Sequence, residues 1–112
     1  FILLRIVQTR APVTGVAPGA VRLALEAPRP NPARSRASLG FTLAQAGPVT
    51  LRVHDVSGRT VRTLAAGGAF AAGRHEIAWD GRADDGSPVA PGLYLVRLES
   101  AGRSLTRRIV RL

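Results

Sequence analysis

Hydrophobic and polar residues alternate along most of the chain, and this period of two predicts β-strands. The clearest case is Val49–His54, where Val49, Leu51 and Val53 lie on one face and polar side chains on the other. The same alternation recurs over residues 21–26, 38–43, 75–80, 93–99 and 105–112. Residues 61–64 are expected to return as the hairpin partner of the 49–54 strand, and no segment has a convincing helical period. The pattern therefore predicts an all-β fold.

Glycine and proline mark the connections between these segments. Gly58 is expected at a positive φ in a tight turn over residues 55–59. Prolines 28, 30 and 32 remove ladder donors, so this stretch is predicted to be an extended edge or crossover segment. Residues 65–73 contain three glycines, which oppose a helix, and are predicted to form a loop with Phe70 against the edge of the core.

About seven short strands with turn signals between them predict an antiparallel β-sandwich of the immunoglobulin or fibronectin type III kind. An all-β barrel is the alternative. Trp79 is in phase with Ile77, and Tyr94 is in phase with Val96, so both rings are predicted to be core anchors rather than an exposed platform for sugars. The predicted structural core is Phe41, Leu51, Val53, Ile77, Trp79, Tyr94, Val96 and Leu98.

The length of 112 residues fits one domain. Residues 8–19 have the Pro- and Gly-rich composition of a linker, and Phe1–Val7 is expected to be the last strand of an upstream domain. We therefore divide the chain into residues 1–19, the end of an upstream domain plus linker, and residues 20–112, the sandwich domain. Because the sequence does not begin with Met, we expect it to be a piece of a longer protein.

The net charge of +9 suggests a nucleic-acid partner at first sight. However, all sixteen basic residues are Arg, and Arg, Ala, Gly and Pro share GC-rich codons. These arginines are spread along the chain, as on a solvated sheet face, so we expect no nucleic-acid partner. No apolar run approaches the roughly 20 residues of a membrane span. Cysteine is absent, which excludes disulfides and thiolate metal sites.

Three carboxylates, Asp80, Asp84 and Asp85, follow the tryptophan and are candidate oxygen ligands for Ca²⁺. Their spacing does not fit an EF-hand, because Pro91 occupies the twelfth position counted from Asp80. The favoured interpretation is that Asp80 and Asp84 bond to loop N–H groups and shape the turn. The predicted turn-shaping residues are Gly58, Asp80, Gly81, Asp84, Gly86 and Gly92.

Catalytic chemistry has few candidates in this sequence. His54 lies on the polar face of its strand, and His75 shares a face with Ile77, so an exposed and a partly buried structural histidine are expected. No G-x-S-x-G motif occurs, and Ser57 precedes the turn glycine Gly58. We expect neither an enzyme nor a cofactor.

A series of motifs resembles one known family. In order, they are N-P at Asn31–Pro32, V-x-D-V-x-G-R-x-V-R-T-L at 53–64, A-G-R-H at 72–75, W-D-G at 79–81, D-x-G at 84–86 and P-G-L-Y-L-V-R-L at 91–98. This series resembles the FlgD-type immunoglobulin-like domain from about Val21 to Leu112. It is also similar to the type A sorting domain of the type IX secretion system, which shares the N-P start.

The resemblance implies a non-catalytic C-terminal β-sandwich module of a bacterial secreted or cell-surface multidomain protein, acting as a sorting, anchoring or domain-packing adaptor. The implied partners are upstream domains of the parent protein and secretion or surface-attachment machinery. The possible recognition element is the last strand, with Leu105, Arg107, Arg108, Ile109 and Val110. A fragment of a flagellar hook-capping assembly protein and a carbohydrate-binding module remain as alternatives.

Overall fold

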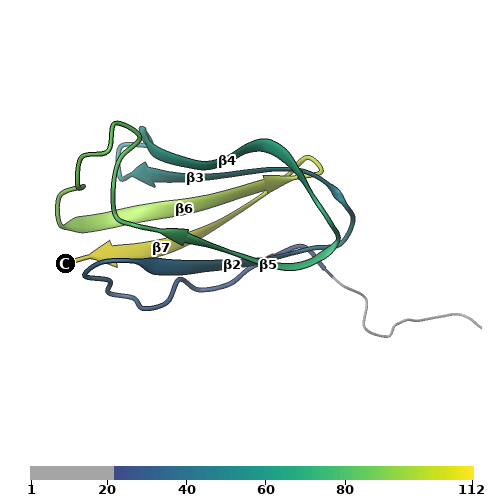
Figure 1. The fold of residues 1–112 in the computed structure, drawn as a ribbon, viewed down its shortest axis with the longest axis horizontal. Coiled ribbons are helices and arrows are strands. Elements are labelled where there is room, and N and C mark those ends of the chain that lie inside the picture. Colours follow the sequence, from purple (N-terminus) through teal and green to yellow (C-terminus); the bar gives the residue numbers. More distant parts are fainter. Residues whose placement is uncertain (1–21) are drawn as a thin grey trace, which may run out of the picture.

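A computed structural model describes residues 22–112, which form a sandwich of two antiparallel sheets (Figure 1). The three-stranded sheet has the order β1-β2-β5, with β1 at Ala24–Leu25, β2 at Ala37–Leu43 and β5 at Gly73–Trp79. The four-stranded sheet has the order β4-β3-β6-β7, with β4 at Thr60–Phe70, β3 at Gly47–Asp55, β6 at Gly92–Ser100 and β7 at Arg103–Arg111. The predicted seven-stranded β-sandwich is confirmed.

The expected linker and upstream strand, residues 1–19, lie outside the described residues, and so does the predicted boundary next to residue 20. Among residues 22–112, no helix is long and apolar enough to cross a membrane.

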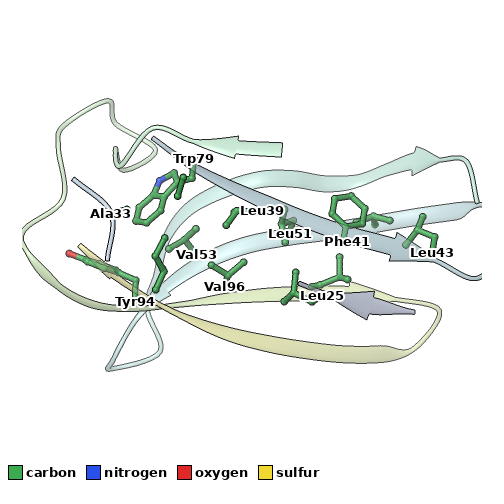
Figure 2. Packing of buried hydrophobic residues seen from close by; sticks show 14 residues of the cluster. Leu25, Ala33, Leu39, Phe41, Leu43, Leu51, Val53, Trp79, Tyr94 and Val96 are labelled. Carbon is green, nitrogen blue, oxygen red and sulfur yellow. The ribbon is translucent and has the colours of Figure 1, made fainter. Parts of the chain in front are cut away.

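The core lies between the two sheets and follows the alternation of the sequence (Figure 2). In β3, Val49, Leu51 and Val53 are fully buried, as the period of two predicts. Trp79 and Tyr94 meet edge to face at one end of the core, with ring centroids 5.7 Å apart. The buried set is Leu25, Ala33, Ala37, Leu39, Phe41, Leu43, Val49, Leu51, Val53, Trp79, Tyr94, Val96, Leu98 and Ile109. Of the predicted core residues, Ile77 alone is only partly buried, packed against this cluster.

The predicted loop at residues 65–73 is wrong, because β4 continues as a strand to Phe70. Its pairing with β3 shifts register three times, which leaves Val61, Leu64 and Gly67 as extra residues without a partner. Each such bulge reverses the phase of the side chains, so the strand shows no alternation in the sequence. Gly67 adopts φ +82°, which suits a glycine at a bulge.

The first strand is shorter than predicted. As a strand, only Ala24 and Leu25 pair with β2, opposite Thr42 and Phe41, and Glu26 adds one backbone bond to Gly40 (N···O 2.9 Å). An isolated bridge then joins Arg29 to Ser38 of β2. The prolines cannot donate to a ladder, and the chain bends through residues 30–32 to reach the end of β7 at Ala33. Phe70 contacts Phe41 edge to face at 5.6 Å, as expected of a residue at the core edge.

Candidate functional site

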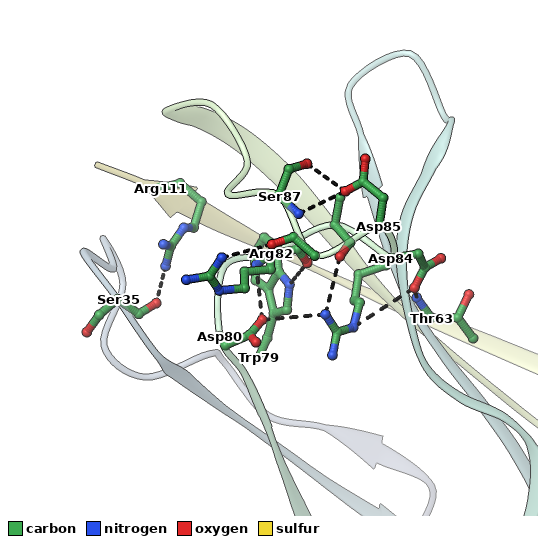
Figure 3. Close-up of polar contacts among 12 residues, drawn as sticks. Ser35, Thr63, Trp79, Asp80, Arg82, Asp84, Asp85, Ser87 and Arg111 are labelled. Atoms are coloured by element: carbon green, nitrogen blue, oxygen red, sulfur yellow. Dashed lines mark hydrogen bonds and ion pairs between the residues drawn. The ribbon is translucent and has the colours of Figure 1, made fainter.

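The loop between β5 and β6 closes on itself through bonds within residues 79–87 (Figure 3). The indole Nε1 of Trp79 donates to the carbonyl of Arg82 (2.9 Å), and the backbone N–H of Arg82 donates to Asp80 Oδ1 (3.0 Å). The guanidinium of Arg82 in turn donates to the carbonyl of Gly86 (2.8 Å). Trp79 is fully buried, so its ring lies between the loop and the core and has no exposed face for a ligand.

Asp85 and Ser87 form a second local closure. The Ser87 hydroxyl and backbone N–H both donate to Asp85 Oδ1, at 2.6 and 2.9 Å. These bonds, the hydroxyl first, hold the pKa of the Asp85 carboxyl below its usual range. The geometry is an Asx-type turn at Asp85, whereas the sequence predicted such bonds for Asp80 and Asp84.

Asp84 forms its hydrogen bonds with β4 rather than with its own loop. Its Oδ1 accepts the N–H of Thr63 on β4 (2.9 Å), and its own N–H donates to the carbonyl of Val61 (2.9 Å). One residue therefore covers the outer edge of β4, much as a neighbouring strand would. Asp84 therefore accepts from an N–H of β4 and not, as predicted, from an N–H of its own loop.

The three carboxylates do not converge on one point. Arg62 lies between Asp80 and Asp84, at 3.6 and 4.0 Å, and Asp85 is bonded to Ser87. Within the part of the chain that the structure describes, no group of three His, Asp or Glu side chains could hold a metal ion. The geometry favours structural roles for these carboxylates over a cation site.

Arg111, near the end of β7, joins three segments. Its guanidinium carbon lies 5.4 Å from the centroid of the Trp79 ring, and its terminal nitrogens donate to the carbonyls of Ser35 and Arg34. The side chain is buried, and Nε has no hydrogen-bond partner among residues 22–112. Gly81, at φ +78°, lies so close that a Cβ there would overlap the guanidinium.

The segment before β2 covers part of the outer edge of β7. Asn31 Oδ1 accepts the N–H of Val110 (2.9 Å), and Asn31 Nδ2 donates to the carbonyl of Arg108 (3.1 Å). Ala33 follows with backbone bonds to Val110 and Leu112, at 2.8 and 3.0 Å. The N-P motif thus caps one end of the β7 edge, as Asp84 caps one end of the β4 edge.

The predicted recognition strand is therefore only partly accessible. Ile109 is fully buried, and the backbone groups of Val110 are taken by Asn31 and Ala33. Leu105 is half-buried, whereas Arg107 and Arg108 are exposed at the edge of the sheet. The side chain of Arg107 crosses to the other sheet and donates to the carbonyl of Leu25 (2.7 Å).

The two histidines lie apart and have separate partners. His54 is within 3.3 Å of the Thr60 hydroxyl, on the outer face of the four-stranded sheet. His75 contacts the carbonyl of Ala71 through Nε2 (2.7 Å) and packs against the rings of Phe41 and Phe70. His75 is partly buried, as predicted, whereas His54 is also partly buried and not exposed as expected. The predicted turn glycines Gly58, Gly81, Gly86 and Gly92 all adopt positive φ.

Sequence reasoning missed Arg111 and the bonding role of Asn31. Arg111 is in phase with Leu105 and Ile109, which places it on the buried face of the strand, and this signal was present in the alternation. The bonds from Asn31 to β7 join residues 77 and 79 positions apart, so no local pattern could reveal them.

Comparisons with known proteins agree with these motifs. A family profile described as the FlgD Ig-like domain matches residues 31–104. Over 85 residues the chain is 35% identical to the basal-body rod modification protein FlgD of Salmonella typhimurium. That alignment covers 75% of this chain but only 36% of the length of that relative.

Three solved structures share the fold. PorU of Porphyromonas gingivalis has a TM-score of 0.65 at 23% identity, over 93% of this chain and 10% of that one. PorZ of the same organism, an essential surface component of the type-IX secretion system, has a TM-score of 0.53 at 20% identity, over 84% and 12%. FlgD of Xanthomonas campestris has a TM-score of 0.54 at 27% identity, over 82% and 67%. The profile match extends over more than half of the sequence, and the chain therefore belongs to the FlgD Ig-like domain family.

Proposed function

We propose that the chain is a non-catalytic adaptor module of a bacterial secreted or cell-surface multidomain protein, which sorts or anchors that protein or packs against its other domains. The observation that carries this proposal is how the motif residues are used. Asn31, Trp79 and Asp84 all bond within the sandwich, so the motifs build the module. What remains for a partner is its surface, above all the edge strand β7.

The separation of the reactive groups supports the absence of catalysis in this proposal. His54 and His75 each have a neighbouring hydroxyl or carbonyl rather than a carboxylate as partner. The carboxylates of the 80–85 loop are bonded to Arg62, Thr63 and Ser87. A nucleophile activated by a histidine also needs a third group that orients the imidazole, and no carboxylate among residues 22–112 contacts either histidine.

The sorting role is supported by the setting of one neighbour of the same fold, since PorZ is a surface component of the type-IX secretion system. A fusion of residues 20–112 to a periplasm-competent reporter tests it in a host that has this machinery. We expect the reporter at the cell surface or in the medium. Thr106→Pro in the same fusion removes an outward N–H of the β7 edge and should reduce export of the reporter. A reporter retained with the unaltered module would contradict the sorting role.

A flagellar role is the second candidate, because the Salmonella and Xanthomonas relatives are FlgD proteins. The structure of the latter was related to the hook capping that is essential for flagellar assembly. The two roles predict different parents. A hook-assembly region upstream of residue 1 in the reading frame favours the flagellar role, and a protease, repeat or propeller domain favours the adaptor of an exported protein.

A carbohydrate-binding role has little support in the geometry. Trp79 is fully buried and Tyr94 is 8% exposed, with its hydroxyl donating to the carbonyl of Ala90 (2.6 Å). Stacking on a sugar needs an exposed ring face. We expect blue-shifted Trp79 emission that does not change when soluble glycans are added.

A further inference from the structure

We propose that the open part of the β7 edge, Ser104–Arg108, binds an extended acidic peptide as an additional strand of the four-stranded sheet. This inference rests on the proposed adaptor role, because it assigns the chemical class of the partner. The proposed partner strand places carboxylates over the outer face of the sheet and apolar side chains toward the seam between the sheets.

The backbone of β7 defines the open segment. Its outward-facing groups belong to the even-numbered residues, since Val110 bonds outward to Asn31 and Ala33. At the same edge, the carbonyl of Arg108 accepts a hydrogen bond from Asn31 Nδ2. Among residues 22–112 no strand or backbone hydrogen bond pairs with the outward N–H of Arg108 or the outward groups of Thr106 and Ser104. β1 contacts β7 from the other sheet, where Arg107 donates to the carbonyl of Leu25, but it does not pair with β7. An unpaired row of this kind is a template for strand addition.

The other edge of the same sheet is protected. β4 is bulged at Val61, Leu64 and Gly67, and Asp84 occupies the groups of Val61 and Thr63. Bulges twist an edge away from a straight partner. In contrast, β7 pairs with β6 from Arg103 to Arg111 without any register shift. The regular edge is therefore the one that can accept a strand.

Charge selects the partner. β7 contains Arg103, Arg107, Arg108 and Arg111 and no acidic residue, and none of the four forms an ion pair within the described part of the chain. Arg97 lies opposite Thr106 on β6 and is paired with Glu99 (3.1 Å), and Arg52 lies opposite Arg97 on β3. These three side chains together leave a net positive charge on the outer face beside the edge. Edge arginines repel a second copy of the same strand. The same charges attract a strand that carries carboxylates.

The outer face of the three-stranded sheet has no such excess of positive charge. There Arg74 binds Glu26 and Glu76, at 2.7 and 2.8 Å, and Arg29 lies 3.5 Å from Glu76, so basic and acidic groups balance. The unbalanced positive charge is thus concentrated on the sheet that has the open edge. On the inner side of that edge, half-buried Leu105 offers an apolar contact.

Titration of the ¹⁵N-labelled protein, residues 1–112, with a capped peptide of alternating Glu and Val tests the proposal by NMR. We expect shift changes at the amides of residues 104–108 and slower exchange of the Thr106 amide. A matched Lys–Val peptide should bind about tenfold more weakly or not at all. Equal binding of both peptides, or shifts confined to β4, would overturn the proposal.

Two variants locate the contact. Thr106→Pro removes an outward donor without breaking the β6 ladder and should weaken binding about tenfold, whereas Thr106→Val keeps the N–H and should bind normally. Arg108→Gln should weaken binding up to about fivefold at low salt, and Arg36→Gln, exposed elsewhere, should not. Unchanged binding by both Thr106→Pro and Arg108→Gln contradicts the proposal, and so does self-association through β7 in sedimentation. If Thr106→Pro does not fold, Arg108→Gln and the Thr106 amide exchange still decide the question. Titration of purified protein needs no secretion host, so this inference and the sorting role can fail independently.

Discussion

The guanidinium of Arg111 lies over the indole of Trp79, with 5.4 Å between the guanidinium carbon and the ring centroid. This contact fixes the last strand to the β5–β6 loop, and the bonds to Ser35 and Arg34 add the segment before β2. The buried charge has no carboxylate partner among the described ion pairs. The aromatic face and the two carbonyls provide its compensation.

Removal of this side chain should destabilise the domain. Arg111→Ala loses the cation–π contact and two hydrogen bonds and leaves a void, and we expect a cost of about 2 kcal/mol in the free energy of unfolding. Arg111→Met keeps an apolar stem without the charge and should cost less. Urea unfolding followed by Trp79 emission measures both. Equal stability of the Arg111→Ala variant and the original protein would contradict this stabilising role of Arg111.

Gly81 should be coupled to Arg111. Gly81→Ala places a Cβ against the guanidinium and strains a residue at φ +78°, so it should cost more than the roughly 1 kcal/mol of the backbone strain alone. In an Arg111→Ala background the overlap is gone, and the added cost should fall to about 1 kcal/mol. A double-mutant cycle measures this coupling. Additive costs would show that the two residues do not touch in solution.

Asp84 should protect the β4 edge. Asp84→Ala leaves the N–H of Thr63 without an acceptor, and we expect a loss of about 1 kcal/mol together with faster exchange of the Thr63 amide. Asp84→Asn keeps the acceptor oxygen and serves as the matched control. Exchange of Thr63 that is the same in all three proteins would refute this role.

Asn31 should protect the C-terminal end of the β7 edge in the same way. Asn31→Ala removes the acceptor for the N–H of Val110 and the donor to the carbonyl of Arg108, at an expected cost of about 1 to 2 kcal/mol. Asn31→Asp retains only the acceptor, so Val110 should stay protected from exchange in that variant. Exchange of the Val110 amide that is the same in Asn31→Ala as in the original protein would refute this role.

Acid should weaken the ion-pair network on the three-stranded sheet. Hydrogen bonds from Arg74 hold the pKa of Glu26 and of Glu76 below their usual range. Because the folded pKa is the lower one, the stabilisation is complete above the unfolded value of about 4.3 and is lost as pH falls through the folded pKa. Melting temperatures between pH 7 and pH 2 should fall less steeply below about pH 4.3 for Arg74→Gln than for the original protein or Arg36→Gln. Parallel curves would contradict a role for Arg74.

Local patterns in the sequence were sufficient for most of the fold. The alternation through Val49, Leu51 and Val53 predicted a strand with one buried face, and the phases of Trp79 and Tyr94 placed both rings in the core. The second half of β4 was not predicted as a strand, because three bulges interrupt the alternation of apolar and polar side chains along it. The bonds of Asp84 and Asn31 join distant segments, so the sequence offers residue types there but not partners.

The clip formed by Asn31 and Ala33 also determines how the domain would bear mechanical load. Ala33 and Arg111 form a parallel bridge, so the chain before β2 and the last strand run side by side in the same direction. A pull that separates residue 22 from residue 112 would slide these segments past each other along their axes. The hydrogen bonds of the clip, and the β6–β7 ladder beside it, would then be loaded together rather than opened one at a time. A module inserted between a cargo and its anchor would resist tension in this geometry better than one whose terminal strands peel apart.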